Sequence, residues 1–84
     1  MYTTYILYSL SLDNYYIGYT GDVMETRLFK HLSNHRGYTA RAKDWSIVYT
    51  EQFATKPEAM AREKQLKSWK SKTRIRQFIE RSTE

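Results

Sequence analysis

Two basic side chains, Arg27 and His31, stand four residues apart in a segment with helical periodicity. Residues at this spacing lie on one side of a helix, so a guanidinium and an imidazole would stand together beside the apolar stripe of Met24 and Leu28. Both groups can reach a single anion, such as a phosphate. Each residue alone is also compatible with an ordinary solvent-exposed surface, so the pair is stronger evidence for an anion-binding site than either residue by itself.

A carboxylate interrupts the apolar face of a later predicted helix. Glu63 lies four residues after Ala59 and three before Leu66, the spacing at which side chains share a helical face. Burying an unpaired carboxylate is costly, so Glu63 should be paired, open onto a cleft or bind a cation. The structural alternative is an ion pair with Lys67, which follows at the favourable i+4 position.

The segment NYYIGYT, residues 14–20, holds three of the eight tyrosines of the chain. It either packs aromatic rings within a strand or delivers phenol hydroxyls to a site. Because side chains alternate along a strand, Tyr15 and Tyr16 should point to opposite faces of the sheet. Gly18 permits a close approach of neighbouring backbone.

The elements that must position these residues follow from composition and capping signals. Aromatic and β-branched runs predict a hairpin of strands at about 3–9 and 15–19 and a third strand at about 45–53. Helices are predicted from Asp22 to about 33, from about 56 to 69 after a Thr55–Glu58 capping box, and beyond the cap residue Ser71. The order ββαβαα indicates an α+β fold, in which an antiparallel three-stranded sheet is covered by helices over a single domain, residues 1–84.

The third predicted helix has an apolar face and a basic face. Ile75, Phe78 and Ile79 share the apolar face. The remaining cations of this helix are expected to face solvent: Lys72, Arg74, Arg76 and Arg81.

Charge and composition narrow the class of partner. The net charge is +5, and residues 55–84 hold nine of the fourteen Lys and Arg but four of the nine Asp and Glu. A basic half of this kind favours a polyanionic partner, although it also fits a solvated lysine-rich surface. The chain has no cysteine, no leader-like start and no apolar run long enough to span a membrane, so a soluble protein of the reducing cytoplasm is expected.

Together these motifs resemble the GIY-YIG nuclease superfamily. The resemblance lies in Tyr5, in YIGYT at 16–20, in the spacing of Arg27 and His31, and in the helical Glu63. It is strongest to small single-domain bacterial members, in which stretches like TARAKDW at 39–45, EAMARE at 58–63 and KSW at 67–69 recur. The match covers about residues 2–80, and the chain departs from larger members in having no asparagine after Glu63.

The resemblance implies the GIY-YIG fold and a metal-dependent DNA endonuclease, with a link to DNA repair or recombination. It places Tyr5 as the general base, Tyr16 as a group that orients phosphate or water, and Arg27 and His31 beside the phosphate. It implies that Glu63 binds one Mg²⁺ or Mn²⁺. A phenol with an ordinary pKa near 10 needs nearby positive charge to serve as a base.

Several cations could hold a phosphate backbone, and Tyr38 and Trp69 offer stacking surfaces, although Trp69 also fits core packing. The candidate nucleic-acid-binding residues are Arg36, Arg41, Lys43, Lys67, Lys70, Lys72 and Arg74. The expected substrate is duplex, branched or single-stranded DNA, with structure-directed cutting or specificity from a protein partner, by a monomer or weak dimer. The alternatives are a nucleic-acid-binding module that cuts poorly or not at all, and a protein-interaction module with an incidental basic surface.

Overall fold

The computed structural model describes residues 1–32 and 38–82, with side chains except at residues 30, 31, 38 and 39. The elements follow the predicted order ββαβαα, with one additional short 3₁₀ turn, η1. They are β1 (Tyr2–Ser9), β2 (Asn14–Thr20), α1 (Met24–Leu32), η1 (Tyr38–Arg41), β3 (Trp45–Phe53), α2 (Lys56–Ser68) and α3 (Lys72–Ser82).

The three strands form one antiparallel sheet in the order β2-β1-β3. In this register Tyr5 of the central strand lies opposite Gly18 on one side and Thr50 on the other. The pairing of β1 with β3 is irregular between Ile6 and Leu7, where the ladder shifts by one residue. The α+β class and the antiparallel sheet predicted from the sequence are therefore confirmed.

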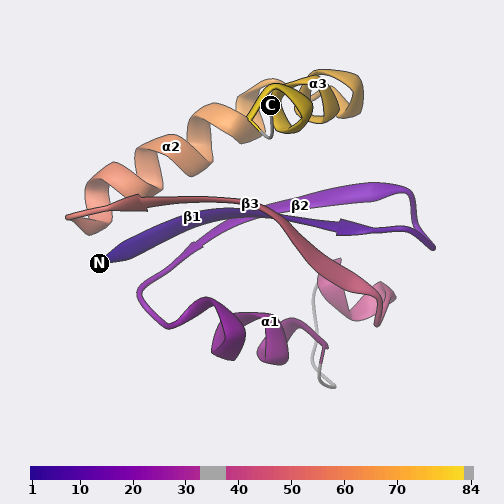
Figure 1. Cartoon of the computed structure of the whole chain (residues 1–84), viewed down its shortest axis with the longest axis horizontal. Coiled ribbons are helices and arrows are strands. Elements are labelled where there is room, and N and C mark those ends of the chain that lie inside the picture. Colours follow the sequence, from indigo (N-terminus) through magenta and orange to yellow (C-terminus); the bar gives the residue numbers. More distant parts are fainter. Residues whose placement is uncertain (33–37, 83–84) are drawn as a thin grey trace.

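Helices cover both faces of the sheet (Figure 1), and each face has its own core. α1 lies against one face, where a cluster forms from Tyr5, Leu7, Ala42 and Trp45. α2 and α3 lie against the other face, where the cluster is Ile6, Ile17, Leu66 and Ile75. Because side chains alternate along β1, this strand is buried on both sides and sends Tyr5 and Ile6 into different cores.

Short-range caps set the ends of the later helices. The Thr55 hydroxyl donates to the Glu58 carboxylate at 2.8 Å and accepts from the Glu58 N–H at 3.4 Å, which confirms the capping box. Ser71 accepts from the Arg74 N–H at 3.2 Å, as its predicted role requires. The first helix differs slightly, because α1 begins at Met24 rather than directly after Asp22.

The cations at the start of α3 are exposed as predicted, yet two of them also bind the turn between β1 and β2. The Lys72 ammonium donates to the Asp13 carbonyl at 2.8 Å, and Arg76 donates to the Asp13 carboxylate at 3.0 Å. Arg76 also donates to the Tyr15 hydroxyl at 3.1 Å. A hydrogen bond from the Tyr8 hydroxyl, followed by the bond from Lys72, holds the pKa of Asp13 below its ordinary value. These contacts fasten the hairpin to α3.

In the described part of the chain, none of the helices combines the length and the apolar character that crossing a membrane requires.

Candidate active site

Tyr5 stands at the centre of the face covered by α1. Its side chain is fully buried in the middle strand, and the Arg27 Nε of α1 donates a hydrogen bond to its hydroxyl at 3.2 Å. The space for the ring comes from Gly18, since a Cβ there would lie 2.6 Å from the Tyr5 hydroxyl and 2.7 Å from its Cζ. The predicted close approach at Gly18 is confirmed, but a phenol ring rather than neighbouring backbone makes it.

Burial and charge act in opposite directions on the Tyr5 phenol. Desolvation raises its pKa, whereas the hydrogen bond and the positive charge of Arg27 lower it, and the net effect is a raised pKa. The bond to Tyr5 raises the pKa of Arg27 in turn, so the guanidinium stays charged. At neutral pH the pair is therefore a neutral phenol held by a cation, and further positive charge would be needed to favour the phenolate.

Tyr16 and Tyr15 point to opposite faces of β2, as the alternation predicted. The Tyr16 ring lies 6.4 Å from the ring of Tyr5 and 6.4 Å from that of Trp45, measured between centroids. Tyr15 packs on the other face, with its ring centroid 4.9 Å from that of Tyr8. The segment NYYIGYT, residues 14–20, thus has both of the roles considered for it, since it packs one ring and brings the other beside Tyr5.

Glu63 reaches the same region from α2. Its side chain is 21% exposed, and its carboxylate lies 3.7 Å from the Lys67 ammonium, the ion pair expected as the structural alternative. The charge of Glu63 also contributes to the raised pKa of Tyr5, so the carboxylate is close enough to act on that phenol. The two interpretations of Glu63 are therefore compatible, because it is paired and it also lies near the candidate site.

The donor set suits one weakly held hard cation. Within residues 1–32 and 38–82, no three His, Cys, Asp or Glu side chains come together as a metal-binding group. A metal ion held by Glu63 would have a single carboxylate ligand, which fits an ion such as Mg²⁺ that keeps most of its coordination shell as water and phosphate oxygen. His31 lies on α1, but its side chain is outside the described residues.

The family comparison adds to this arrangement of Tyr5, Tyr16, Arg27 and Glu63. The model of the GIY-YIG catalytic domain matches residues 1–76. The chain belongs to the GIY-YIG family. A GIY-YIG catalytic domain is a nuclease domain, so the protein is an endonuclease that hydrolyses phosphodiester bonds in DNA, and such nucleases generally use divalent metal ions. A search of curated proteins and a search of solved structures each return no significant match.

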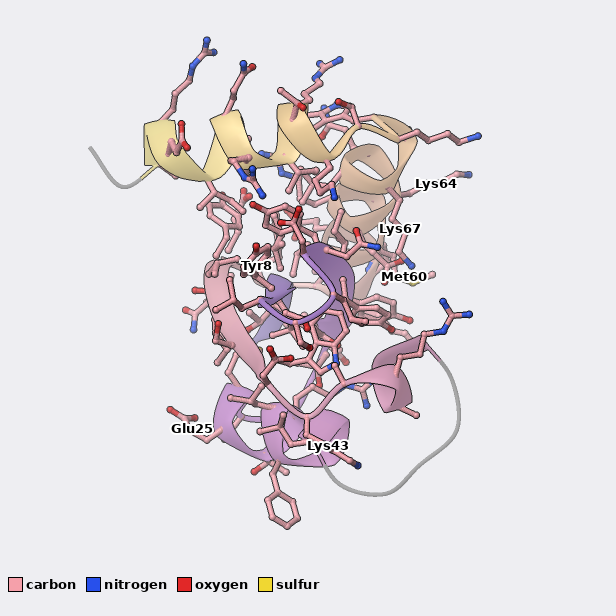
Figure 2. All side chains as sticks on the ribbon, turned by 90° about the vertical axis from the view of Figure 1, so that its right-hand side faces the viewer. Tyr8, Glu25, Lys43, Met60, Lys64 and Lys67 are labelled. Atoms are coloured by element: carbon pink, nitrogen blue, oxygen red, sulfur yellow. The ribbon has the colours of Figure 1, made fainter. Side chains whose placement is uncertain are left out.

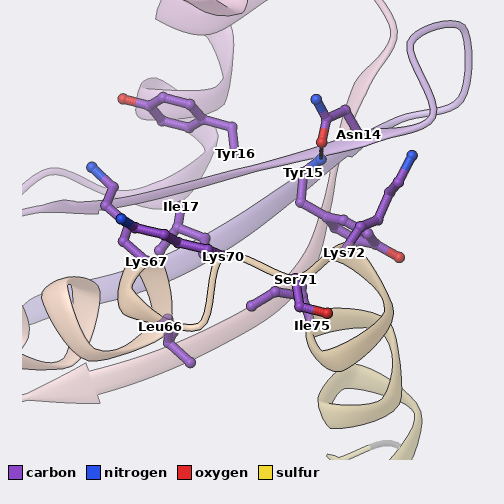
Figure 3. Close-up of a pocket in the computed structure, with 10 residues that line it drawn as sticks. All are labelled: Asn14, Tyr15, Tyr16, Ile17, Leu66, Lys67, Lys70, Ser71, Lys72 and Ile75. Atoms are coloured by element: carbon purple, nitrogen blue, oxygen red, sulfur yellow. Dashed lines mark hydrogen bonds between the residues drawn. The ribbon is translucent and has the colours of Figure 1, made fainter.

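The basic residues predicted to bind nucleic acid lie in different parts of this GIY-YIG domain. Lys67, Lys70 and Lys72 line a groove of about 480 Å³ between β2 and the junction of α2 with α3 (Figure 3). Arg41 and Lys43 are exposed between α1 and β3, whereas Arg36 is outside the described residues.

Arg74 was predicted to face solvent, but it also stacks on an aromatic ring. Its guanidinium lies 4.4 Å from the ring centroid of Trp69, and that ring meets Phe78 edge-on at 5.4 Å. The core-packing interpretation of Trp69 is therefore confirmed, and Arg74 stacks on it. The side chain of Tyr38, the other stacking candidate, is not described.

Sequence reasoning singled out the three lysines but missed the groove between them. The groove depends on the bend after α2, where Lys70 has a φ of 49°. A positive φ at lysine has no sequence signal comparable to glycine or asparagine, so the bend could not be anticipated.

Proposed function

We propose that this GIY-YIG domain is a metal-dependent endonuclease whose active site consists of Tyr5, Tyr16, Arg27, His31 and Glu63. The observation that carries the proposal is the hydrogen bond from Arg27 to the buried Tyr5 hydroxyl, within the electrostatic reach of Glu63. Phosphodiester hydrolysis needs a proton acceptor for the attacking water, positive charge at the non-bridging oxygens and support for the leaving oxygen. A phenol, a guanidinium and a metal-binding carboxylate supply these three functions.

In this proposal the phenolate form of Tyr5 takes the proton of the attacking water and becomes the neutral phenol. Burial raises the pKa of Tyr5 and so disfavours the phenolate, whereas the hydrogen bond from Arg27 lowers the pKa and favours it. Because Arg27 stays protonated, it also stabilises the negative charge that develops on the phosphate. Tyr16 orients the phosphate or the water through its hydroxyl, and His31, one turn along α1 from Arg27, relays a proton or contacts the same phosphate.

Glu63 would hold the single Mg²⁺ or Mn²⁺ ion. When bound, the ion acts as a Lewis acid on the phosphate and the leaving oxygen. The Lys67 ammonium, 3.7 Å from the Glu63 carboxylate, neutralises that carboxylate without the ion. With substrate and ion in place, Lys67 is free to turn to a phosphate oxygen.

The proposed substrate preference is for DNA structure rather than sequence, in a repair or recombination role. Base-edge recognition usually accompanies about 1,000 Å² or more of buried protein surface, a large share of a domain with a radius of gyration of 12.4 Å. Branched, flapped or single-stranded DNA offers a shape to recognise, and a protein partner would supply any further specificity.

The test compares the wild type with Glu63→Gln on labelled duplex, single-stranded, flap and junction DNA, in Mg²⁺, Mn²⁺ or EDTA. Glu25→Gln is the matched control, since it removes the same charge from a side chain that extends away from the sheet on α1 (Figure 2). Loss of the metal ligand should lower cleavage by two decades or more, because a metal contributes several kcal/mol at about 1.4 kcal/mol per decade.

Metal-dependent cleavage that survives in Glu63→Gln would contradict the proposed mechanism. DNA binding without cleavage by wild type and variant alike would instead favour the silent nucleic-acid-binding module. Equal losses in both glutamine variants would show that net charge, not metal binding, accounts for the effect.

A further inference from the structure

A groove runs along the outer edge of β2, opposite the junction of α2 and α3 (Figure 3). Its volume of about 480 Å³ lies within the range of small-molecule binding sites. The lining combines apolar residues, Ile17, Leu66 and Ile75, with the cationic residues Lys67, Lys70 and Lys72. Such a lining suits a ligand that has both a flat apolar body and negative charge.

The backbone at Lys70 has an unusual conformation. Lys70 directly follows Trp69, the C-cap of α2, and adopts a left-handed conformation with a φ of 49°. Helices commonly end with glycine at this position, because a Cβ is crowded in the left-handed region. A lysine in this conformation is slightly less favourable than glycine, and it places an ammonium group at the groove.

The groove borders the candidate active site through Lys67. Lys67 lines the groove, and its ammonium lies 3.7 Å from the Glu63 carboxylate. Tyr16 borders the groove at the edge of the sheet, while its ring packs with Tyr5 on the opposite face of β2. In Figure 3 the side chains of Lys67 and Lys70 extend toward one end of the groove and Lys72 stands at the opposite end, while the Tyr16 ring points away from Leu66 and Ile75.

We propose that this groove holds an unpaired nucleotide that flanks the scissile phosphate, with its base against the apolar lining and its phosphates on Lys67 and Lys70. The inference rests on the proposed function, because it takes the scissile phosphate to lie at Tyr5 and Glu63. Paired bases in a duplex are stacked and cannot reach an apolar groove, whereas an unpaired base can turn into it. The substrate class is therefore DNA with a single-stranded stretch next to the cut.

Binding is tested first, in EDTA, with fluorescent oligothymidylate and with blunt duplex DNA. Lys70→Gly removes the ammonium and the crowded Cβ, and Lys64→Gln is the control, since Lys64 is an exposed α2 residue outside the groove lining (Figure 2). Losing one phosphate contact should reduce the slope of log affinity against log salt by about 0.7 and weaken single-strand binding roughly fivefold at 0.1 M salt. The melting temperature of Lys70→Gly should rise, which excludes misfolding as the cause.

Two binding results would overturn the proposal. One is Lys70→Gly binding single strands as the wild type does, and the other is an equal loss in Lys64→Gln. Displacement of the oligonucleotide by polyglutamate at equal charge concentration would also overturn it, because the groove would then be a general polyanion or acidic-protein site.

Cleavage is tested second, on a duplex with and without a single-stranded arm at the cut. Wild type should prefer the armed substrate by at least tenfold in kcat/KM, and Lys70→Gly should reduce that preference below threefold. Equal cleavage of both substrates by the wild type would refute the groove inference and leave the nuclease proposal intact. Lys70-dependent binding of single strands without any metal-dependent cleavage would refute the nuclease proposal and leave the groove as a site that binds single strands.

Discussion

Gly18→Ala separates the two effects that a side chain at this strand position would have. In a strand interior, alanine is favoured over glycine by about 0.5–1 kcal/mol of backbone free energy, so propensity predicts a more stable protein. Packing predicts the opposite, because the new Cβ would lie 2.6 Å from the Tyr5 hydroxyl, well inside the ordinary contact distance of 3.4 Å or more. The phenol must therefore move by about 0.8 Å, the difference between these two distances.

The buried Tyr5 ring has little freedom to make that movement. Overpacking of this kind costs about 1–3 kcal/mol, so after the gain from propensity we expect a net loss of about 1 kcal/mol, and at most about 2.5 kcal/mol, in the free energy of unfolding. The same shift disrupts the 3.2 Å hydrogen bond from Arg27, and a misplacement near 1 Å can lower the rate about 100-fold. Urea unfolding followed by tryptophan fluorescence measures the first effect, and single-turnover DNA cleavage measures the second.

Gly21→Ala is the matched control, because its Cβ would meet an edge of the Tyr2 ring at 3.1 Å in an exposed turn. This variant should stay within about 0.5 kcal/mol and a few-fold of the wild type, as surface substitutions usually do. Wild-type stability and cleavage in Gly18→Ala would refute the reasoning, since either the Tyr5 phenol is not fixed at this place or its position does not matter for the reaction.

Three further predictions follow from the hydrogen bonds. Because burial raises the pKa of Tyr5, cleavage should increase with pH into the alkaline range. Because Arg27 lowers the same pKa, Arg27→Gln should shift the pH profile of kcat/KM to higher pH. A shift to lower pH would contradict this prediction. The hydrogen bond from Tyr8 lowers the pKa of Asp13, so the ionised Asp13 carboxylate stabilises the fold above about pH 4. This stabilisation is lost as the pH falls through the pKa that Asp13 has in the folded state. Asp13→Asn should therefore melt at a lower temperature than the wild type at pH 7 and at the same temperature in stronger acid. Thr55→Ala should lose about 1 kcal/mol in urea unfolding, whereas Thr55→Ser should lose much less, and equal losses would show that the hydroxyl is not what matters.

The parts of the fold that depend on local chemistry could be predicted from the sequence. The Thr55–Glu58 box and Ser71 mark where α2 and α3 begin, and alternation along 14–20 separates Tyr15 from Tyr16. These are interactions within a few residues, so the chain order alone contains them.

The contacts that join distant segments could not be predicted in the same way. Lys72 and Arg76 look like solvated helical cations until the hairpin brings Asp13 against them, 59 residues away in the case of Lys72. The bond between Arg27 and Tyr5 likewise requires α1 to pack on the central strand. The family resemblance indicated the residues of the site. That Gly18 leaves room for the Tyr5 ring is visible only in the three-dimensional structure.

The placement of one core on each face of a single sheet bears on how this protein could be engineered. The core under α2 and α3 contains Ile6, Leu66 and Ile75, none of which belongs to the proposed catalytic set. The core under α1 contains Tyr5 itself, so a substitution that improves packing there also moves the reacting group. Substitutions that raise heat resistance should therefore be sought in the α3 part of the other core, around Phe78 and Ile79, away from Glu63 and from the groove that Ile17, Leu66 and Ile75 line.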